Sequence, residues 1–323
     1  MRTKIVYVLV SQESDYYYEM FLLSHYSLRL HHPKGDAEVV LVMDTDTHQR
    51  LVDKKAPVLN DVTPVVVSIP EEYTIMQRSR YLKTSLRQRV EGDFLFLDTD
   101  TLVCENLVLI DGIDAEIAMV ADGHNLHETR TVWIERCKQA RFDHPEEYAY
   151  YNSGVIYCKE CNSSRLLFKK WHEVWKQSAS LGINYDQPAL WKANHSVGGT
   201  IQELCGTWNC QVVSPLHAEY LQRSKILHYF VSVNLSLLQY FLFSHIKKVG
   251  SITESTSQIA LSPRETGISV FSLTMNNERV MYYVFSDLLH VYDYTPPVFR
   301  FLILLSRLLM KPVRILAKLK QHL

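Results

Sequence analysis

Runs of apolar residues alternate with amphipathic segments through the first half of the chain. Five apolar runs predict strands, at residues 4–10, 37–44, 62–69, 93–98 and 116–122. Residues 15–30 and 79–90 lie between these runs and have the spacing of helices. Because the apolar runs do not alternate with polar residues, we expect strands that are buried on both faces of a mostly parallel sheet. The pattern predicts a doubly wound α/β fold, in which ligands bind at the carboxyl ends of the strands.

The same layer continues into the second half of the chain. Residues 154–159 predict a further strand, and residues 164–178 predict a helix with one apolar face. We expect that face to pack in the core, through Leu167, Trp171, Val174 and Trp175. Pro64 removes a backbone donor from the run at 62–69, which indicates an edge strand or a strand that starts late.

The pattern weakens after about residue 230, which divides the chain in two. Residues 250–264 are rich in Ser and Thr and are typical of a loop, and residues 271–285 have the pattern of a hairpin. We therefore predict an N-terminal α/β domain at 1–230 and a mixed C-terminal extension at 231–323.

The end of the extension, residues 298–323, is both apolar and basic. It has no acidic residue and six basic ones: Arg300, Arg307, Lys311, Arg314, Lys318 and Lys320. On a helix with about 100° per residue, the first five fall within an arc of roughly 60°. This predicts an amphipathic helix, kinked at Pro312, that binds an anionic membrane surface. The alternative is a helix packed on the protein, whose basic side chains reach solvent past an apolar surface.

Composition and charge narrow the class of protein. The 323 residues are 47% hydrophobic and 21% charged, with only 11 Gly and 11 Pro, which excludes a disordered or collagen-like chain. With 34 Lys and Arg against 35 Asp and Glu, the formal net charge of -1 argues against a nucleic-acid partner. Without the six basic residues of the tail, the rest of the chain has 28 basic and 35 acidic residues. The rest of the chain is therefore net acidic, whereas the tail is basic.

The N-terminal apolar run and the cysteines indicate the cellular compartment in which we expect the protein. Residues 5–10 are too short for a signal peptide, and residues 226–246 contain too many polar residues to span a membrane. We therefore expect a cytoplasmic protein whose six cysteines are free thiols. The alternative is a zinc site built from Cys158, Cys161, Cys205 and Cys210.

The most informative local motif is FLFLDTDT, residues 94–101. A buried strand ends there in two carboxylates, Asp98 and Asp100, which alternation places on the same side. Two carboxylates at a ligand-binding edge repel each other, and a hard divalent cation that also binds diphosphate, Mn²⁺ or Mg²⁺, would relieve this. The alternative is a pair that caps a turn. A second pair, Asp44 and Asp46, has the same form, and we expect it to be structural or to contact a nucleotide.

Four motifs in this order resemble those of retaining glycosyltransferases of family 8 type. They are FLFLDTDTLV at 94–103, YYNSGVIYCK at 150–159, NYDQPAL at 184–190 and KILHYF at 225–230. The resemblance covers roughly residues 1–230. It implies a GT-A fold, with a Rossmann-like sheet flanked by helices, and a nucleotide-sugar donor.

The resemblance also implies roles for individual residues around the cation. Asp98, Asp100 and His228 would bind Mn²⁺ or Mg²⁺, although a lone His in an apolar run can also be a core residue. The family follows this His with a Gly and a Lys-Pro-Trp segment, whereas this chain has Tyr229, Phe230 and Val231. Phosphate binding by that segment is therefore in doubt.

Further residues would bind the donor. The resemblance implies that Lys83 and Arg80, three places apart on one helix face, contact the donor phosphate or sugar. The alternative is a solvated helix face, since Arg87 and Arg89 follow. The resemblance further implies that Asn152 and Ser153, beside Gly154, contact the donor sugar. It implies that Asp186 and Gln187 form a catalytic pair beneath the reacting sugar. It also implies that Val10 and Ser11, at the end of the first strand, contact the nucleoside.

Asp186 can also cap the helix that follows it, a role that is compatible with catalysis. The resemblance, taken with these residues, implies a metal-dependent glycosyltransferase that moves a hexose to a glycan or lipid-linked acceptor with retention. UDP-hexose is the expected donor. We expect it to act in the synthesis of cell-surface polysaccharide or lipopolysaccharide at the cytoplasmic face of a membrane. A nucleotidyltransferase and a non-catalytic sugar- or membrane-binding relative remain alternatives, although the N-terminal VLVSQES lacks the Gly-rich loop of the former.

Overall fold

A computed structural model of the chain forms two compact units, Met1–Val270 and Phe271–Leu323. In the first unit, the structure describes residues 1–12, 17–125, 127–142, 149–211, 220–221 and 223–228. In the second it describes Pro297, Val298, Phe301, Leu304, Leu305 and Leu308. The domain boundary expected at residue 230 and the hairpin expected at 271–285 involve residues outside these ranges, so both stay predictions.

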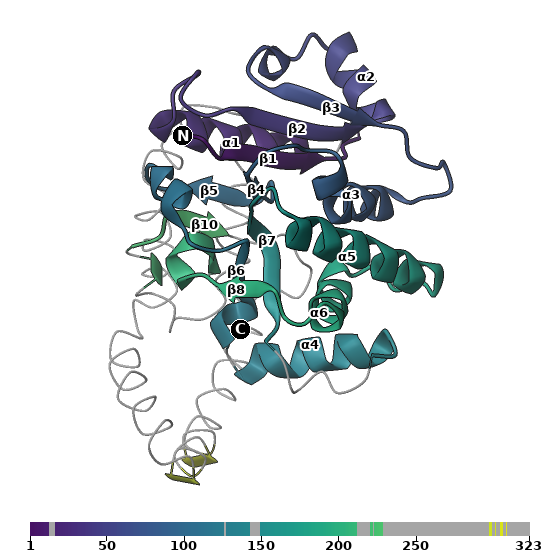
Figure 1. Ribbon diagram of the computed structural model, residues 1–323, viewed down its shortest axis with the longest axis vertical. Coiled ribbons are helices and arrows are strands. Elements are labelled where there is room, and N and C mark those ends of the chain that lie inside the picture. The colour runs from purple at the N-terminus through teal and green to yellow at the C-terminus, as the bar shows by residue number, and fades with distance from the viewer. Residues whose placement is uncertain are drawn as a thin grey trace, which may run out of the picture. The chain divides into compact units, whose positions relative to one another are not determined.

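Seven strands in the described part of the chain form one main sheet (Figure 1). In spatial order they are β3 (Thr63–Val67), β2 (Val39–Asp44), β1 (Lys4–Leu9), β4 (Phe94–Leu97), β7 (Tyr151–Cys158), β6 (Ile117–Ala121) and β8 (Ile201–Glu203). In this sheet β7 runs antiparallel to its neighbours β4 and β6, and the other pairings are parallel. The predicted α/β fold with a mostly parallel sheet is confirmed.

The sequences of the strands explain their places in the sheet. Every residue of β2 and β4 is buried, as expected for apolar runs that pack on both faces. Pro64 lies in β3 at the edge of the sheet, where one position without a backbone donor is tolerated. The predicted edge strand is therefore confirmed.

Helices cover both faces of the main sheet (Figure 1). They are α1 (Tyr17–His31) and α2 (Thr45–Asp53) on one face, and α3 (Ile75–Thr84), α5 (Asn162–Ser180) and α6 (Asp186–Ser196) on the other, with α4 (His127–Gln139) beside α6. The ring of Phe21 in α1 packs edge-on against Tyr7 of β1, with centroids 5.2 Å apart. On the opposite face, Phe168 of α5 packs edge-on against Phe94 of β4 at 6.0 Å. The helices thus bury the apolar faces that their sequences predict.

A second, small sheet joins segments that lie far apart in the sequence. It consists of β5 (Thr101–Val103), β10 (Ile226–His228) and β9 (Cys210–Gln211), in that order. The strand β10 runs antiparallel to β5, and their register pairs His228 with Thr101. This pairing brings His228 of KILHYF next to Thr101, the last residue of FLFLDTDT.

Several element boundaries differ from the sequence-based expectation. The helix expected over 79–90 is α3, which begins at Ile75 because Thr74 and Gln77 form a capping box. The strand expected over 154–159 begins at Tyr151, as β7. Short 3-10 segments complete the described elements: Pro57–Asn60, Leu86–Gln88, Val108–Gly112, Asp122–Asn125 and Gly206–Asn209.

None of the described helices combines the length and the apolar character that crossing a bilayer requires.

Candidate active site

The acidic motif forms a tight turn between β4 and β5. The backbone N–H of Asp98, directly after β4, donates to the carbonyl of Gly154 at 2.8 Å. The hydroxyl of Thr101, the first residue of β5, donates to the carbonyl of Asp98, also at 2.8 Å. These bonds hold both ends of the turn, so Asp98 and Asp100 project from one short, fixed segment.

The turn and β10 together create a cluster of possible metal ligands. Asp98, Asp100 and His228 each offer one ligand atom, and these atoms lie within 4.8 Å of one another. The Nε2 atom of His228 lies 3.3 Å from Oδ1 of Asp100. Two carboxylates and one imidazole, supplied from two separate segments, fit a divalent cation. The residues expected to bind the cation are therefore brought together.

The two carboxylates of this cluster differ electrostatically. Burial raises the pKa of Asp98, and repulsion from Asp100 adds to this effect, while Lys83 opposes it. Burial alone would also raise the pKa of Asp100. Attraction and a hydrogen bond from His228 outweigh that effect and lower the pKa of Asp100. Asp100 is thus favoured as a carboxylate anion beside His228.

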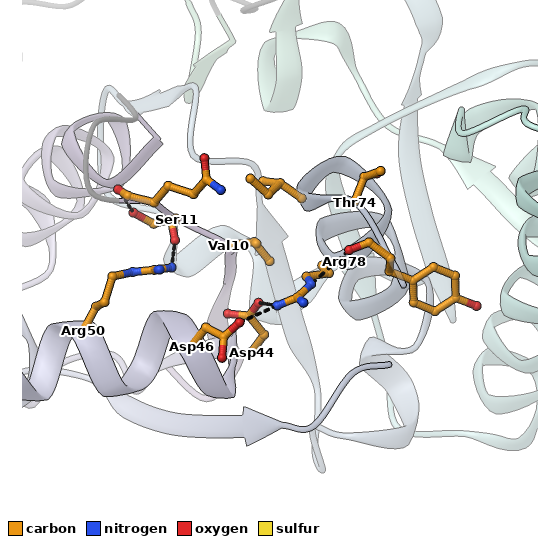
Figure 2. A pocket seen from close by; sticks show the side chains of 10 residues that line it. Val10, Ser11, Asp44, Asp46, Arg50, Thr74 and Arg78 are labelled. Atoms are coloured by element: carbon orange, nitrogen blue, oxygen red, sulfur yellow. Dashed lines mark hydrogen bonds and ion pairs between the residues drawn. The ribbon is translucent and has the colours of Figure 1, made fainter. Parts of the chain in front are cut away.

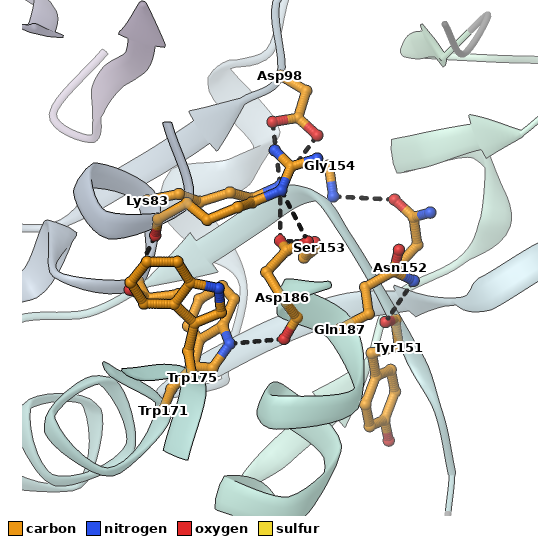
Figure 3. Close-up of polar contacts among 12 residues, drawn as sticks. Lys83, Asp98, Tyr151, Asn152, Ser153, Gly154, Trp171, Trp175, Asp186 and Gln187 are labelled. Atoms are coloured by element: carbon orange, nitrogen blue, oxygen red, sulfur yellow. Dashed lines mark hydrogen bonds and ion pairs between the residues drawn. The ribbon is translucent and has the colours of Figure 1, made fainter. Parts of the chain in front are cut away.

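The helix α3 supplies two cations to the same site, as Figure 3 shows for Lys83. Lys83 is only 2% exposed, and its Nζ lies 3.0 Å from both carboxylate oxygens of Asp98. The same Nζ lies 3.3 Å from Oδ2 of Asp186, and Nε of Arg80 lies 3.1 Å from Oδ1 of Asp186. The two basic residues therefore share one face, as their spacing predicts. The alternative of a solvated face is wrong for Lys83, and the neighbouring Arg87 is also buried, paired with Glu160 at 2.7 Å.

Asp186 is the first residue of α6, and its carboxylate pairs with Arg80 and with Lys83, the latter shown in Figure 3. The prediction that Asp186 caps the helix is wrong, because Tyr185 occupies the cap position and Asp186 lies inside the helix. Its carboxylate instead accepts a hydrogen bond from the hydroxyl of Ser153 at 2.8 Å. Burial would raise the pKa of Asp186, but Arg80 and then Lys83 outweigh it and hold that pKa well below its usual range.

The strand β7 aligns the expected donor-binding residues beside these carboxylates. Asn152 donates through Nδ2 to Oδ1 of Asp122 at 2.9 Å, and its own Oδ1 accepts from the backbone N–H of Gly154 at 2.9 Å. Gln187 donates to the carbonyl of Tyr151 at 3.3 Å and also hydrogen-bonds Asp122. Asn152 and Gln187 are therefore held on Asp122, whereas Ser153 is held on Asp186.

Val10 and Ser11 line a separate cavity of about 400 Å³ at the carboxyl ends of β1 and β2 (Figure 2). Its remaining lining residues are Gln12, Asp44, Asp46, Arg50, Tyr73, Thr74, Ile75 and Arg78. The backbone N–H of Ser11 donates to the hydroxyl of Thr47 at 3.0 Å, and Arg50 donates to the carbonyl of Ser11. The chain after β1 is thus fixed as one wall of this cavity.

The second acidic pair forms another part of the cavity. Asp44 caps α2 by accepting a hydrogen bond from the backbone N–H of Thr47 at 2.9 Å. Arg78 links the pair, with its Nη1 atom 3.2 Å from Asp44 and 2.6 Å from Asp46 (Figure 2). The structural role expected for this pair is present, and both residues also line the cavity.

The site contains residues that the sequence analysis did not select. Asp122 directly follows β6, as Asp98 follows β4, so its position at a strand end was an available signal. Arg78, which lines the cavity, lies on α3 two residues before the selected Arg80. Asn209 hydrogen-bonds both His228 and Asn152, and its sequence neighbourhood gives no sign of this. Residues 229–231, where the sequence departs from the family's phosphate-binding segment, lie outside the described residues.

The cysteines do not form the alternative metal site. All six are free thiols. Among the residues that the structure describes, the one cluster of three or more potential metal ligands is that of Asp98, Asp100 and His228. The zinc site proposed as an alternative for the four cysteines is therefore wrong.

The sequence matches a known protein family. The profile of the nucleotide-diphospho-sugar transferase family matches residues 36–245, which include Asp98, Asp186 and His228. No curated protein sequence matches the chain.

Two solved proteins are similar in structure. The apo form of mouse xyloside xylosyltransferase 1 has 15% sequence identity and a TM-score of 0.47, and the match covers 73% of this chain and 99% of that chain. The glycosyltransferase GlyE of Streptococcus pneumoniae TIGR4 has 14% identity and a TM-score of 0.49, or 0.45 for its apo form. The match with GlyE covers 81% of this chain but only 63% of that chain.

Proposed function

The chain belongs to the nucleotide-diphospho-sugar transferase family, and we propose that it transfers a hexose from a UDP-sugar to a hydroxyl of a glycan acceptor. Family membership confirms the prediction of a glycosyltransferase. The finer proposal is carried by one observation. Asp98, Asp100 and His228, which come from separate segments, place three ligand atoms within 4.8 Å of one another at the carboxyl end of β4.

The donor is proposed to lie across the carboxyl ends of β1, β2 and β4. Its nucleoside would occupy the cavity lined by Val10, Ser11 and the pair Asp44 and Asp46. Its diphosphate would lie at the Asp98 cluster, because β4 is the direct neighbour of β1. A divalent cation, Mn²⁺ or Mg²⁺, would supply Lewis-acid stabilisation of charge on the leaving diphosphate.

Residues of this chain then have distinct tasks in the proposed reaction. Lys83 and Arg80 balance the negative charge that gathers around the diphosphate. Asp186, which its cationic neighbours keep ionised, would stabilise positive charge at the anomeric carbon, with Gln187 and Asn152 hydrogen-bonding sugar hydroxyls. The acceptor hydroxyl oxygen attacks that carbon, the bond to the diphosphate oxygen breaks, and the hydroxyl proton passes to the leaving diphosphate. Attack from the side of the leaving group gives retention.

Isothermal titration with UDP-glucose and UDP-galactose, each with Mn²⁺ and with EDTA, tests this proposal. We expect binding of at least one nucleotide sugar that requires Mn²⁺, accompanied by slow release of UDP through hydrolysis. Screening further nucleotide sugars in the same way would identify the donor. A folded sample that binds no nucleotide sugar in a metal-dependent way would contradict the proposal.

We further propose that the basic end of the chain binds an anionic membrane surface and brings the enzyme to a lipid-linked acceptor at the cytoplasmic face. The described apolar residues of this segment are exposed by 42% to 62%: Val298, Phe301, Leu304, Leu305 and Leu308. Their spacing of three to four residues gives one apolar face of a helix. Six basic residues and no acidic residue at 298–323 complement anionic headgroups.

Vesicle co-sedimentation of the full chain tests the membrane proposal. We expect binding to phosphatidylglycerol vesicles, little binding to phosphatidylcholine vesicles, and loss of binding in the variant Arg307→Glu, Lys311→Glu, Arg314→Glu. The control variant Lys169→Glu, Lys170→Glu, Lys176→Glu reverses three charges on α5 and should bind as the native chain does. Equal binding to both vesicle types, or equal binding of all three proteins, would contradict the proposal.

A further inference from the structure

The buried side chain of Asn209 connects the proposed metal ligand His228 with Asn152 on β7. Asn209 ends the 3-10 helix Gly206–Asn209 and is fully buried. Its Nδ2 donates to Oδ1 of Asn152 at 2.9 Å, and its Oδ1 lies 3.0 Å from Nδ1 of His228. Because Asn152 in turn donates to Asp122 at 2.9 Å, the contacts form a continuous chain of four side chains.

The direction of every bond in this chain is fixed by one backbone group. The N–H of Gly154 can only donate, and it donates to Oδ1 of Asn152 at 2.9 Å. That contact identifies the oxygen of Asn152, so its Nδ2 faces the carboxylate of Asp122, which is an acceptor. The amide of Asn209 must then point its Nδ2 at the Asn152 oxygen. Its remaining oxygen faces His228 and can only accept.

We propose that Asn209 is a positioning residue that keeps a proton on Nδ1 of His228 and so leaves Nε2 to bind the cation. This inference rests on the proposed metal site. The ring nitrogen that binds a metal is set by the hydrogen bond that the other nitrogen makes. In this site the bond to Nδ1 ends in an oxygen whose orientation is set by the backbone of β7.

Without this chain of hydrogen bonds, the tautomer of His228 with its proton on Nε2 would compete with the tautomer that has its proton on Nδ1. Oδ1 of Asp100 lies 3.3 Å from Nε2, and a carboxylate in that place favours a proton on Nε2. In a neutral His228 with its proton on Nε2, the lone pair of Nδ1 would face the Asn209 oxygen and repel it. Reversing the Asn209 amide would instead place two oxygens against each other at Asn152. Asn209 thus opposes the effect of Asp100 on the ring.

The proposal is tested on the metal-free protein by ¹⁵N NMR of the His228 ring at alkaline pH, and by Mn²⁺ affinity from electron paramagnetic resonance. The variant Asn209→Leu keeps the size of the side chain and removes both hydrogen bonds. The variant Asn209→Asp keeps an acceptor for Nδ1. We expect Nδ1 to be protonated in the native chain and in Asn209→Asp, but not in Asn209→Leu. Asn209→Leu should bind Mn²⁺ about 10- to 100-fold more weakly than the native chain, the usual cost of losing a residue that supports a metal ligand.

The protonation of the His228 ring and the Mn²⁺ affinity test the role of Asn209 without any need for sugar transfer. An unprotonated Nδ1 in the native chain would overturn the proposal, and this measurement needs no variant to fold. A folded Asn209→Leu with a protonated Nδ1, or with native Mn²⁺ affinity, would overturn it as well. Native protein that shows the expected tautomer but no Mn²⁺ binding would instead count against the metal site itself.

Discussion

The ammonium group of Lys83 lies 3.0 Å from both carboxylate oxygens of Asp98. The same group lies 3.3 Å from Asp186, so one buried cation lies between the proposed metal ligand and the proposed catalytic carboxylate. Its Nζ also lies 5.1 Å from the centre of the Phe96 ring, on β4. Lys83 therefore couples the charges of two carboxylates that the sequence places 88 residues apart.

Replacing Lys83 by Met should weaken both the fold and the binding of donor. The change leaves two carboxylates without their shared buried cation, and breaking such a pair typically costs about 3–5 kcal/mol. Urea unfolding would measure the loss of stability, and titration with UDP and Mn²⁺ would measure donor affinity. Lys83→Arg keeps the charge and should retain more of both, while a Lys83→Met variant with native stability would contradict this account.

Asp100→Asn should abolish turnover while leaving the fold intact. The change removes an anionic ligand from the cluster but retains the size of the side chain, and Asp100 is not needed by the main sheet. We expect Mn²⁺ affinity, measured without nucleotide, to fall by at least about 100-fold, beyond the cost of losing a supporting residue. Asp46→Asn, in the other acidic pair, serves as the control and should keep native Mn²⁺ affinity. Turnover that survives in Asp100→Asn would show that the metal assignment is wrong.

Gly154→Ala should disturb the metal cluster through direct contact with His228. A Cβ atom at this position would lie 2.2 Å from Cε1 and 2.7 Å from Nδ1 of the ring, so the ring must move. We expect Mn²⁺ affinity to fall and the His228 ring resonances to shift. Gly112→Ala is the matched control, since a Cβ there meets no atom within 4 Å. Equal Mn²⁺ affinity in the two variants would contradict the proposed position of His228.

The sequence predicted those parts of the site that depend on strand ends. Asp98 and Asp100 follow a buried apolar run, and such runs end at the ligand edge of a parallel sheet. Because strand ends are local features, the pattern of apolar and polar residues is sufficient to find these two carboxylates. Lys83 and Arg80 were expected from the family resemblance, and their helical spacing added only that they share one face of α3.

Other parts of the site depend on contacts between distant segments. His228 reaches Asp100 because β10 pairs with β5, and β5 has only three residues, too few for a recognisable period. Asn209 has no local signal, since its role comes from contacts with residues 19 and 57 positions away. Asp186 was open to a capping role because an acidic residue before a Pro-containing first turn is typical of helix starts. The ion pairs from α3 and the actual cap at Tyr185 decide otherwise.

His172 makes the packing of α5 on α3 sensitive to pH. Its Nδ1 lies 2.8 Å from the hydroxyl of Thr84 at the end of α3, and its ring packs edge-on against Tyr81 at 4.8 Å. Burial, followed by repulsion from Lys176 and Arg89, lowers the pKa of His172 from 6.5 to about 4. In the folded protein His172 is thus neutral at pH values where the unfolded chain would protonate it.

The sign of the effect on stability follows from proton binding. Between pH 6.5 and about 4, the unfolded chain binds a proton at His172 that the folded chain does not, so stability falls as the pH is lowered through this window. His172→Gln cannot titrate but can still hydrogen-bond Thr84. We expect urea unfolding of this variant to show a shallower loss of stability between pH 6.5 and 4 than the native chain. His25, whose pKa is also lowered to about 4, contributes equally to both proteins and cancels from the comparison. Identical pH dependence in the two proteins would mean that His172 is not held neutral against α3.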